Sequence, residues 1–303
     1  MKEYFYKQEY KYMYLSIFFY NFANALSETF GTVMLYKAGL PIYLILLIYG
    51  IRFLIMGLIT PAFVTISSKI GIAKCILISN LFNIIYAYFI LVNQNLSANI
   101  IIFIIVMGLN GLSNPSSDAL SSKYVESEHR GRFNSFYSIS KILGTVLASC
   151  LVAWGVISNK TLILFVVLTV FFLLQYLTIL KIDYKPEKKS SVFKSSITLI
   201  YLFVRDKFII SINKTISDNV SKVYDTSIQT SIQNIIKESK ENNELLSAVG
   251  QMSLCFTEVL VFGLLALIAR FIGENVFYVI FILSIVSTIV INIDIKLENK
   301  KFL

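Results

Sequence analysis

The sequence predicts an all-α polytopic membrane protein that crosses the bilayer eight to ten times. Hydrophobic residues make up 56% of the 303 residues and charged residues 15%, against about 25% charged residues in soluble domains. The mean hydropathy is +0.71. A soluble core cannot bury this much apolar surface, whereas segments of roughly 20 apolar residues match a hydrocarbon layer roughly 30 Å thick. The chain length leaves room for about eight to ten such segments.

Apolar segments of helical length follow one another closely in the first 181 residues. Each is long enough to span the bilayer. They lie at 13–36, 42–66, 72–92, 98–120, 134–157 and 161–181. Two more are predicted near the carboxy terminus, at 245–270 and 276–293.

The chain between these two groups of helices is less apolar. Residues 192–212 are moderately apolar, and 213–236 carry four charges of alternating sign on one helical face, namely Lys214, Asp218, Lys222 and Asp225. This face predicts either an amphipathic helix on the membrane surface or a helix that lines a water-filled pathway. Whether residues 192–236 cross the membrane therefore decides between eight and ten crossings.

Basic residues gather in alternate connections between the apolar segments. The connections that would lie on the other side carry only Lys37 and Lys160. Because cytoplasmic loops hold the excess of Lys and Arg, we expect both termini to be cytoplasmic. The net charge of +9 is thereby explained by topology, so no nucleic-acid partner is predicted. A composition rich in Ile, Asn, Lys and Tyr indicates an AT-rich genome, and we expect a bacterial cell membrane.

The sequence lacks the motifs of common enzyme and metal sites. It contains no P-loop, dinucleotide-binding glycine fingerprint, HExxH motif or nucleophile elbow. Cys75, Cys150 and Cys255 are too far apart in sequence to show the spacing of a metal site. The single histidine, His129, falls in a predicted loop, which excludes a histidine relay within the membrane. Neither an enzyme nor a bound cofactor is predicted.

Two ionisable residues lie deep inside the first two apolar segments. Glu28 and Arg52 are each about twelve residues from the turn at 37–41, which corresponds to roughly 18 Å of helix. In an antiparallel hairpin both therefore lie near the bilayer midplane. An ionised side chain at this depth costs about 2.5 to 3.5 kcal/mol and is rare without a function. Glu258, central in the segment 245–270, is an alternative partner for Arg52.

Two of the segments carry a stripe of polar residues at helical spacing. The first stripe consists of Asn21, Asn24, Glu28 and Thr32. The second consists of Asn110, Asn114, Asp118 and Ser121. Polar groups that face lipid lose hydrogen bonds, so such stripes turn inward, either to line a cavity or to bond neighbouring helices.

A second charged pair is predicted in the hairpin formed by the fourth and fifth segments. Asp118 and Lys141 are each about eleven to twelve residues from the loop centre at 129–130, so they reach one depth. Either they form an intramembrane ion pair, or both lie near the interface, where Lys141 can snorkel. If protons drive transport, the candidate carriers are the carboxylates Glu28, Asp118 and Glu258.

Three stretches resemble the major facilitator superfamily. Gly-Leu-Asn-Gly-Leu-Ser-Asn-Pro at 108–115 looks like that family's fourth helix, and His-Arg-Gly-Arg-Phe-Asn-Ser at 129–135 looks like the loop before its fifth. Residues 68–74 resemble the signature Asp-Arg-x-Gly-Arg-Arg, with Ser68 in place of the acidic residue. The resemblance implies gating loops that contain Lys69, Gly71, Lys74, Arg130, Gly131 and Arg132.

The resemblance implies both an architecture and an activity. The architecture is a six-helix bundle over 1–185, a cytoplasmic linker or short helix at 186–212, and an incomplete second bundle at 213–303. The activity is secondary active transport of a small solute by alternating access, with the first and fourth helices as cavity walls. The solute and any coupling proton or ion are left open.

Two departures from the family pattern restrict this expectation. Met107 stands where the arginine linked to proton coupling is found, and Ala148-Ser149 stand where drug antiporters carry a Gly-Pro pair. Proton-driven drug efflux is therefore not predicted. The shortened second half also supports an alternative, a truncated, non-transporting membrane protein that acts as a partner subunit or receptor. In that case an open flank would be covered by a second copy or a partner chain.

Overall fold

The computed structural model describes residues 8–92, 95–109, 125, 130–182, 243–280 and 282. These residues form helices joined by tight turns. The elements are α1 (Gln8–Lys37), α2 (Ile42–Ile70), α3 (Ile72–Val92), α4 (Leu96–Gly108), α6 (Arg130–Ile157), α7 (Thr161–Ile179), α10 (Asn243–Ile272) and the short 3-10 helix η4 (Gly273–Asn275).

Most helix positions expected from the sequence are confirmed, although several boundaries differ. α2, for example, continues to Ile70 rather than ending at residue 66. α6 begins at Arg130, four residues before the expected segment 134–157, and α1 begins at Gln8 rather than at residue 13. α4 ends at Gly108. Residues 110–120 of the expected fourth helix, the whole of 192–236 and most of 276–293 lie outside the described residues.

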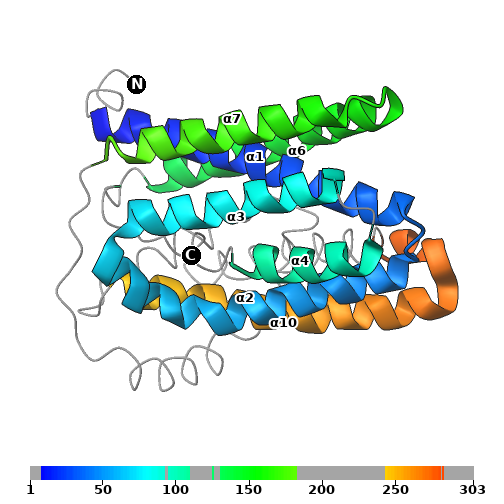
Figure 1. Cartoon of the computed structure of the whole chain (residues 1–303). Coiled ribbons are helices and arrows are strands. Elements are labelled where there is room, and N and C mark those ends of the chain that lie inside the picture. Colours follow the sequence, from blue (N-terminus) through cyan, green and yellow to red (C-terminus); the bar gives the residue numbers. More distant parts are fainter. Residues whose placement is uncertain are drawn as a thin grey trace, which may run out of the picture.

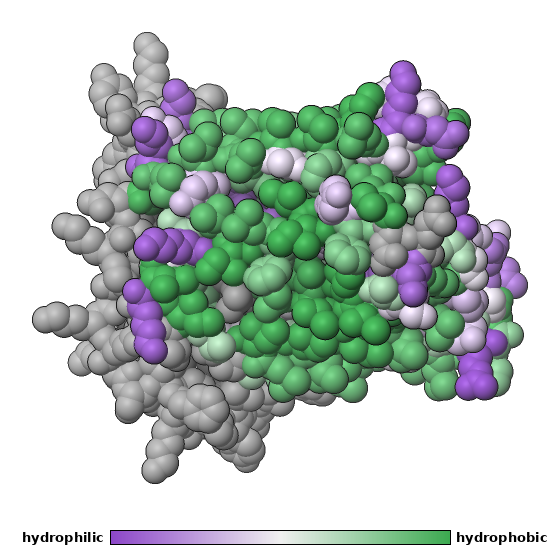
Figure 2. Space-filling model, in the orientation of Figure 1, coloured by the Kyte–Doolittle hydropathy of each residue, from purple (hydrophilic) through white to green (hydrophobic). Residues whose placement is uncertain are grey.

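Five helical stretches in the described part of the chain are long and apolar enough to cross a membrane. They are Ile42–Thr60, Ile72–Val92, Arg132–Ile157, Thr161–Ile179 and Leu254–Ile280. α4 is apolar but shorter, and α1 is long but less apolar than these five. Figure 2 shows the corresponding surface, an apolar band with hydrophilic residues gathered at its two ends. This distribution fits a protein whose middle faces lipid.

The helices run side by side, and α1 lies among the others (Figure 1). α1 packs against α6 and α7 on one side and also contacts α2, α3 and α4. Because its neighbours shield it from lipid, α1 can carry the polar stripe that lowers its hydropathy.

α2 and α10 form the most extensive helix pair of the described structure. Two glycines of α2 allow this approach, since a Cβ at Gly57 would lie 3.1 Å from the Cβ of Cys255 and one at Gly50 would lie 3.6 Å from the Cβ of Phe262. Small residues at such positions let helix backbones approach closely, which is how helices associate where lipid offers no hydrophobic driving force.

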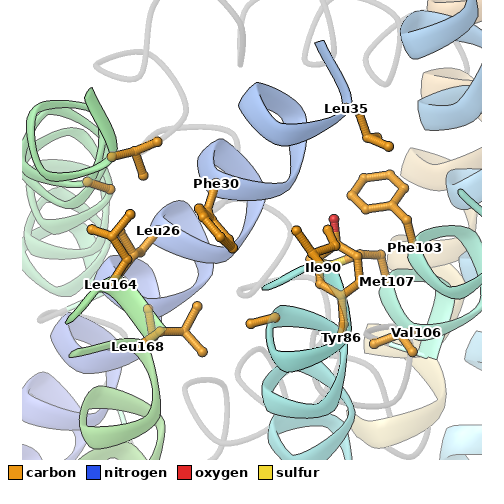
Figure 3. Close-up of a cluster of buried hydrophobic side chains, with 14 of the residues drawn as sticks. Leu26, Phe30, Leu35, Tyr86, Ile90, Phe103, Val106, Met107, Leu164 and Leu168 are labelled. Carbon is orange, nitrogen blue, oxygen red and sulfur yellow. The ribbon is translucent and has the colours of Figure 1, made fainter. Parts of the chain in front are cut away.

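An apolar core fills the space between α1, α3, α4 and α7 (Figure 3). Leu26 and Phe30 of α1 belong to it, and Leu26 lies beside Leu164 and Leu168 of α7. Leu35, one helical turn beyond Phe30, lies toward Phe103 of α4. The core therefore holds α1 rigidly on both sides of the position of Glu28.

Candidate functional site

An ion pair joins α1 to α2 through the two charged residues that the sequence places at equal distances from the turn between these helices. Nη2 of Arg52 donates a hydrogen bond to Oε1 of Glu28. The Arg52 side chain is 5% exposed, whereas that of Glu28 is 32% exposed. The guanidinium carbon lies 4.9 Å from the ring centroid of Phe53, 5.3 Å from that of Tyr49 and 6.0 Å from that of Phe103. The cation is thus enclosed by a carboxylate and by aromatic faces, both of which attract it.

Tyr49 forms a second link between the same two helices. Its hydroxyl bonds to Oγ1 of Thr32, and that oxygen donates in turn to the backbone oxygen of Glu28 at 2.8 Å. Because Thr32 uses its proton on Glu28, the phenol of Tyr49 is the donor toward Thr32. The same residue therefore contacts Arg52 through its ring and α1 through its hydroxyl.

Several buried polar atoms near this pair have remaining hydrogen-bonding capacity. Nε and Nη1 of Arg52, Oδ1 of Asn24 and Oγ of Ser27 are buried without a hydrogen-bond partner among the described residues. The same holds for Oη of Tyr86, which points at α1 so closely that a Cβ on Gly31 would lie 2.1 Å from it. The facing surfaces of α1, α2 and α3 thus hold buried donors and acceptors that have hydrogen-bonding capacity left.

The first residue of the α1 stripe bonds to a different helix from Glu28 and Thr32. Asn21 is buried and donates through Nδ2 to Oγ of Ser140, at 2.6 Å, and to the backbone oxygen of Tyr137, at 3.3 Å. Gly144 lets α6 approach here, since a Cβ on it would lie 3.2 Å from the backbone of Asn21. Asn21 therefore fits the alternative of bonding between helices.

A buried amide pair joins α3 to α7 and is not evident from the sequence. Asn80 donates through Nδ2 to Oε1 of Gln175 at 2.8 Å, and both side chains are buried. Asn80 lies beside Ser79 and three residues before Asn83 in α3, whereas Gln175 is the only amide residue of α7. No sequence spacing relates them because they belong to different hairpins. The bond fixes the relative positions of α3 and α7, as expected for polar contacts inside a helix bundle.

The expected gating loop between α2 and α3 is a single residue. Gly71 has φ +88° and donates its backbone N–H to the oxygen of Ser67 at 2.7 Å. Such a φ favours glycine, because a Cβ would be strained there. Lys69 and Lys74, on either side of it, are exposed.

The first turns of α6 lie at the same end of the bundle. Apolar residues of α1, α2, α3, α6 and α10 gather there in one cluster, including Met13, Phe63, Ile72, Phe133 and Ala248. Arg130 and Gly131 form the first turn of α6, and Arg132 is exposed. Exposed basic residues from two connections thus share this end, in agreement with the charge asymmetry of the sequence.

The remaining predicted site residues fall into two groups. Asn110, Asn114 and Asp118 lie outside the described residues, so the pairing of Asp118 with Lys141 stays a prediction. Lys141 is half-buried on α6. Glu258 is half-buried on α10, the helix that packs along α2, but the ion pair that the structure describes for Arg52 is with Glu28.

Tyr49 and Tyr86 are contacts of the site that the sequence analysis did not single out. Tyr49 lies three residues before Arg52 and therefore on the same face of α2, a signal that was present in the sequence. Tyr86 lies on α3, and its approach to Gly31 depends on how α3 packs against α1. No spacing within one helix could have revealed it.

Comparison with known proteins identifies the family to which this apolar helix bundle belongs. No curated protein matches the chain significantly. A family model described as the Major Facilitator Superfamily matches residues 12–293. This match covers α1 from residue 12 onward and all the other described helices, and it includes both partners of the ion pair. The chain therefore belongs to the Major Facilitator Superfamily and is a multi-pass membrane transporter.

Proposed function

We propose that the protein is a secondary active transporter that moves a small solute by alternating access, and that the Glu28–Arg52 pair senses the solute or a coupling proton. The observation that carries this proposal is the ion pair itself, which lies deep in the apolar bundle. Charges at such positions are costly and mark substrate or ion pathways in membrane proteins.

The two partners differ in a way that suits an exchange of partners. Glu28 is partly exposed, so a proton or a cationic group can reach its carboxylate, whereas Arg52 is buried with two nitrogen atoms that have no hydrogen-bond partner among the described residues. Breaking a buried ion pair with nothing in its place costs about 3 to 5 kcal/mol. A solute that supplies an anionic group to Arg52 removes this cost, so separation of α1 from α2 is coupled to occupancy.

The remaining charges of the proposed pathway are Asp118, Lys141 and Glu258. We propose that they serve the same cavity, with Asn24, Asn110 and Asn114 as its polar walls. If protons drive transport, Glu28, Asp118 and Glu258 are the carboxylates that would carry them. We expect the end that carries the basic residues near the α2–α3 turn and the start of α6 to face the cytoplasm, because cytoplasmic loops hold the excess of Lys and Arg.

The test is solute flux in proteoliposomes. A panel of small solutes is first screened by thermal shift, because a ligand that binds the folded state stabilises it whatever the mechanism. For each solute that stabilises the protein, we expect Glu28→Gln to abolish flux driven by a pH or solute gradient. Arg52→Lys keeps the charge but loses the planar fork, so we expect weaker solute binding.

Two controls keep the result interpretable. Each variant must elute as a single species of wild-type size, and flux is expressed per folded molecule. Flux of Glu28→Gln at the wild-type rate would refute the role of the ion pair. A wild-type protein that is stabilised by no solute and moves none would favour the alternative, a non-transporting subunit or receptor.

A further inference from the structure

One hydrogen bond bridges two distant parts of the chain at the end of the bundle where α1 turns into α2. Oη of Tyr36 donates to Oε1 of Glu274 at 2.9 Å, across 238 residues of sequence. Tyr36 lies in the last turn of α1, and Glu274 lies in η4, directly after α10. The two segments meet at the right-hand end of Figure 1.

The end of α1 holds Tyr36 in a defined position. The N–H of Gly39 bonds to the oxygen of Tyr36 at 2.9 Å, and the N–H of Leu40 bonds to the oxygen of Leu35 at 3.3 Å. With φ +89° at Gly39, these two bonds form a Schellman motif. Leu35 and Leu40 are both buried, which is the apolar contact that accompanies this motif. The backbone of Tyr36 is therefore fixed although its side chain is exposed.

Glu274 is held in place from the other side. Gly273 has φ +60°, which turns the chain sharply at the end of α10. Val276, two residues after Glu274, is fully buried and belongs to one apolar cluster with Ile42 and Tyr43 at the start of α2. The segment around Glu274 thus closes over the beginning of α2, and its carboxylate is presented to Tyr36.

We propose that the Tyr36–Glu274 hydrogen bond is a latch that stabilises the closed state of this end of the transporter. The inference rests on the proposed alternating access, which requires that each end opens in turn. The bond suits this role because it lies in water: Tyr36 is 52% exposed, so water can replace each partner when the bond breaks. Such an exposed bond contributes little free energy to the closed state, which permits opening. It acts together with the burial of Val276.

The latch is tested through the accessibility of Val276. In a background with Cys75, Cys150 and Cys255 replaced by alanine, Val276→Cys provides a reporter thiol that is fully buried in the closed state. The rate of its reaction with a membrane-impermeant maleimide measures opening. We expect Tyr36→Phe and Glu274→Ala each to raise this rate about two- to fivefold, the effect of one net hydrogen bond. The double variant should show no further increase, because both substitutions remove the same bond.

Tyr278→Phe is the matched control. It removes a hydroxyl from another exposed tyrosine in the same segment, so we expect the labelling rate to stay unchanged. Equal labelling rates in Tyr36→Phe, Tyr278→Phe and the reporter background would overturn the latch, as would additive effects of Tyr36→Phe and Glu274→Ala. Because the reporter cysteine itself can disturb folding, hydrogen exchange of residues 272–280 in a chain with Tyr36→Phe alone provides a second readout of the same opening.

Labelling requires no transported solute, so this test and the flux test fail separately. Unchanged labelling together with flux that depends on Glu28 overturns the latch and leaves the proposed transport intact. Faster labelling in Tyr36→Phe with flux equal to wild type would show that the bond stabilises this end of the bundle without affecting transport. That outcome overturns the gating role. Faster labelling together with an altered flux rate is the outcome that supports the latch.

Discussion

Removal of one charge at a time from the Glu28–Arg52 pair should destabilise the protein unequally. Glu28→Gln leaves a guanidinium that is 5% exposed without its counter-ion, and we expect a loss of about 3 kcal/mol, the lower end of the range for a broken buried pair. The amide oxygen of the introduced glutamine and the aromatic rings around the guanidinium compensate in part for the lost carboxylate. Arg52→Gln leaves a carboxylate that is 32% exposed and can be hydrated or take a proton, so we expect about 1 to 2 kcal/mol.

The double variant Glu28→Gln/Arg52→Gln completes the cycle. It leaves no buried charge, so its stability should lie within about 1 kcal/mol of that of Arg52→Gln, which corresponds to a coupling of about 3 kcal/mol, equal to the loss expected for Glu28→Gln. Unfolding of the purified variants in detergent is followed by heat and by denaturant. At about 2 to 4 °C per kcal/mol, the midpoint of Glu28→Gln should fall by about 6 to 12 °C. Additive losses, or an Arg52→Gln variant less stable than Glu28→Gln, would refute the reasoning.

Two further predictions concern close helix contacts. Gly31→Ala places a Cβ 2.1 Å from Oη of Tyr86, so it should reduce the stability by about 1 to 3 kcal/mol. Tyr86→Phe removes that oxygen and should restore part of the loss in the same unfolding assay. A double variant as unstable as Gly31→Ala alone would contradict this. Gly144→Val should destabilise the protein by a similar amount, because its Cβ would lie 3.2 Å from the backbone of Asn21. Gly263→Val is the control. A Cβ there has no atom within 4 Å, so the unfolding midpoint should change little.

Depth along a helix could be predicted from sequence, and the direction in which a side chain points could be predicted only in part. Glu28 and Arg52 were expected at one level because the rise per residue is constant, and they meet there. The sequence offered Glu258 as an alternative, since helical spacing does not say which helix is the neighbour. The structure describes the ion pair of Arg52 with Glu28, although α2 packs more extensively against α10 than against α1.

The polar stripe of α1 shows the same division between sequence and structure. Its spacing predicted correctly that these residues share one side of a helix. Asn21 nevertheless bonds to α6, whereas Glu28 and Thr32 bond to α2. A stripe that extends over more than two helical turns meets different neighbours along its length, so one role cannot be assigned to all its residues.

The sequence by itself determined the class of protein, the position of most helices and the equal distance of Glu28 and Arg52 from their turn, because apolar length, charge distribution and helical rise are properties of the chain alone. Only the tertiary structure decided which groups meet: Arg52 with Glu28, Asn80 with Gln175, and Tyr36 with Glu274. These contacts depend on the rotation and packing of each helix against its neighbours, to which residues distant in sequence contribute. The chemistry of the site therefore depends on the bundle as a whole.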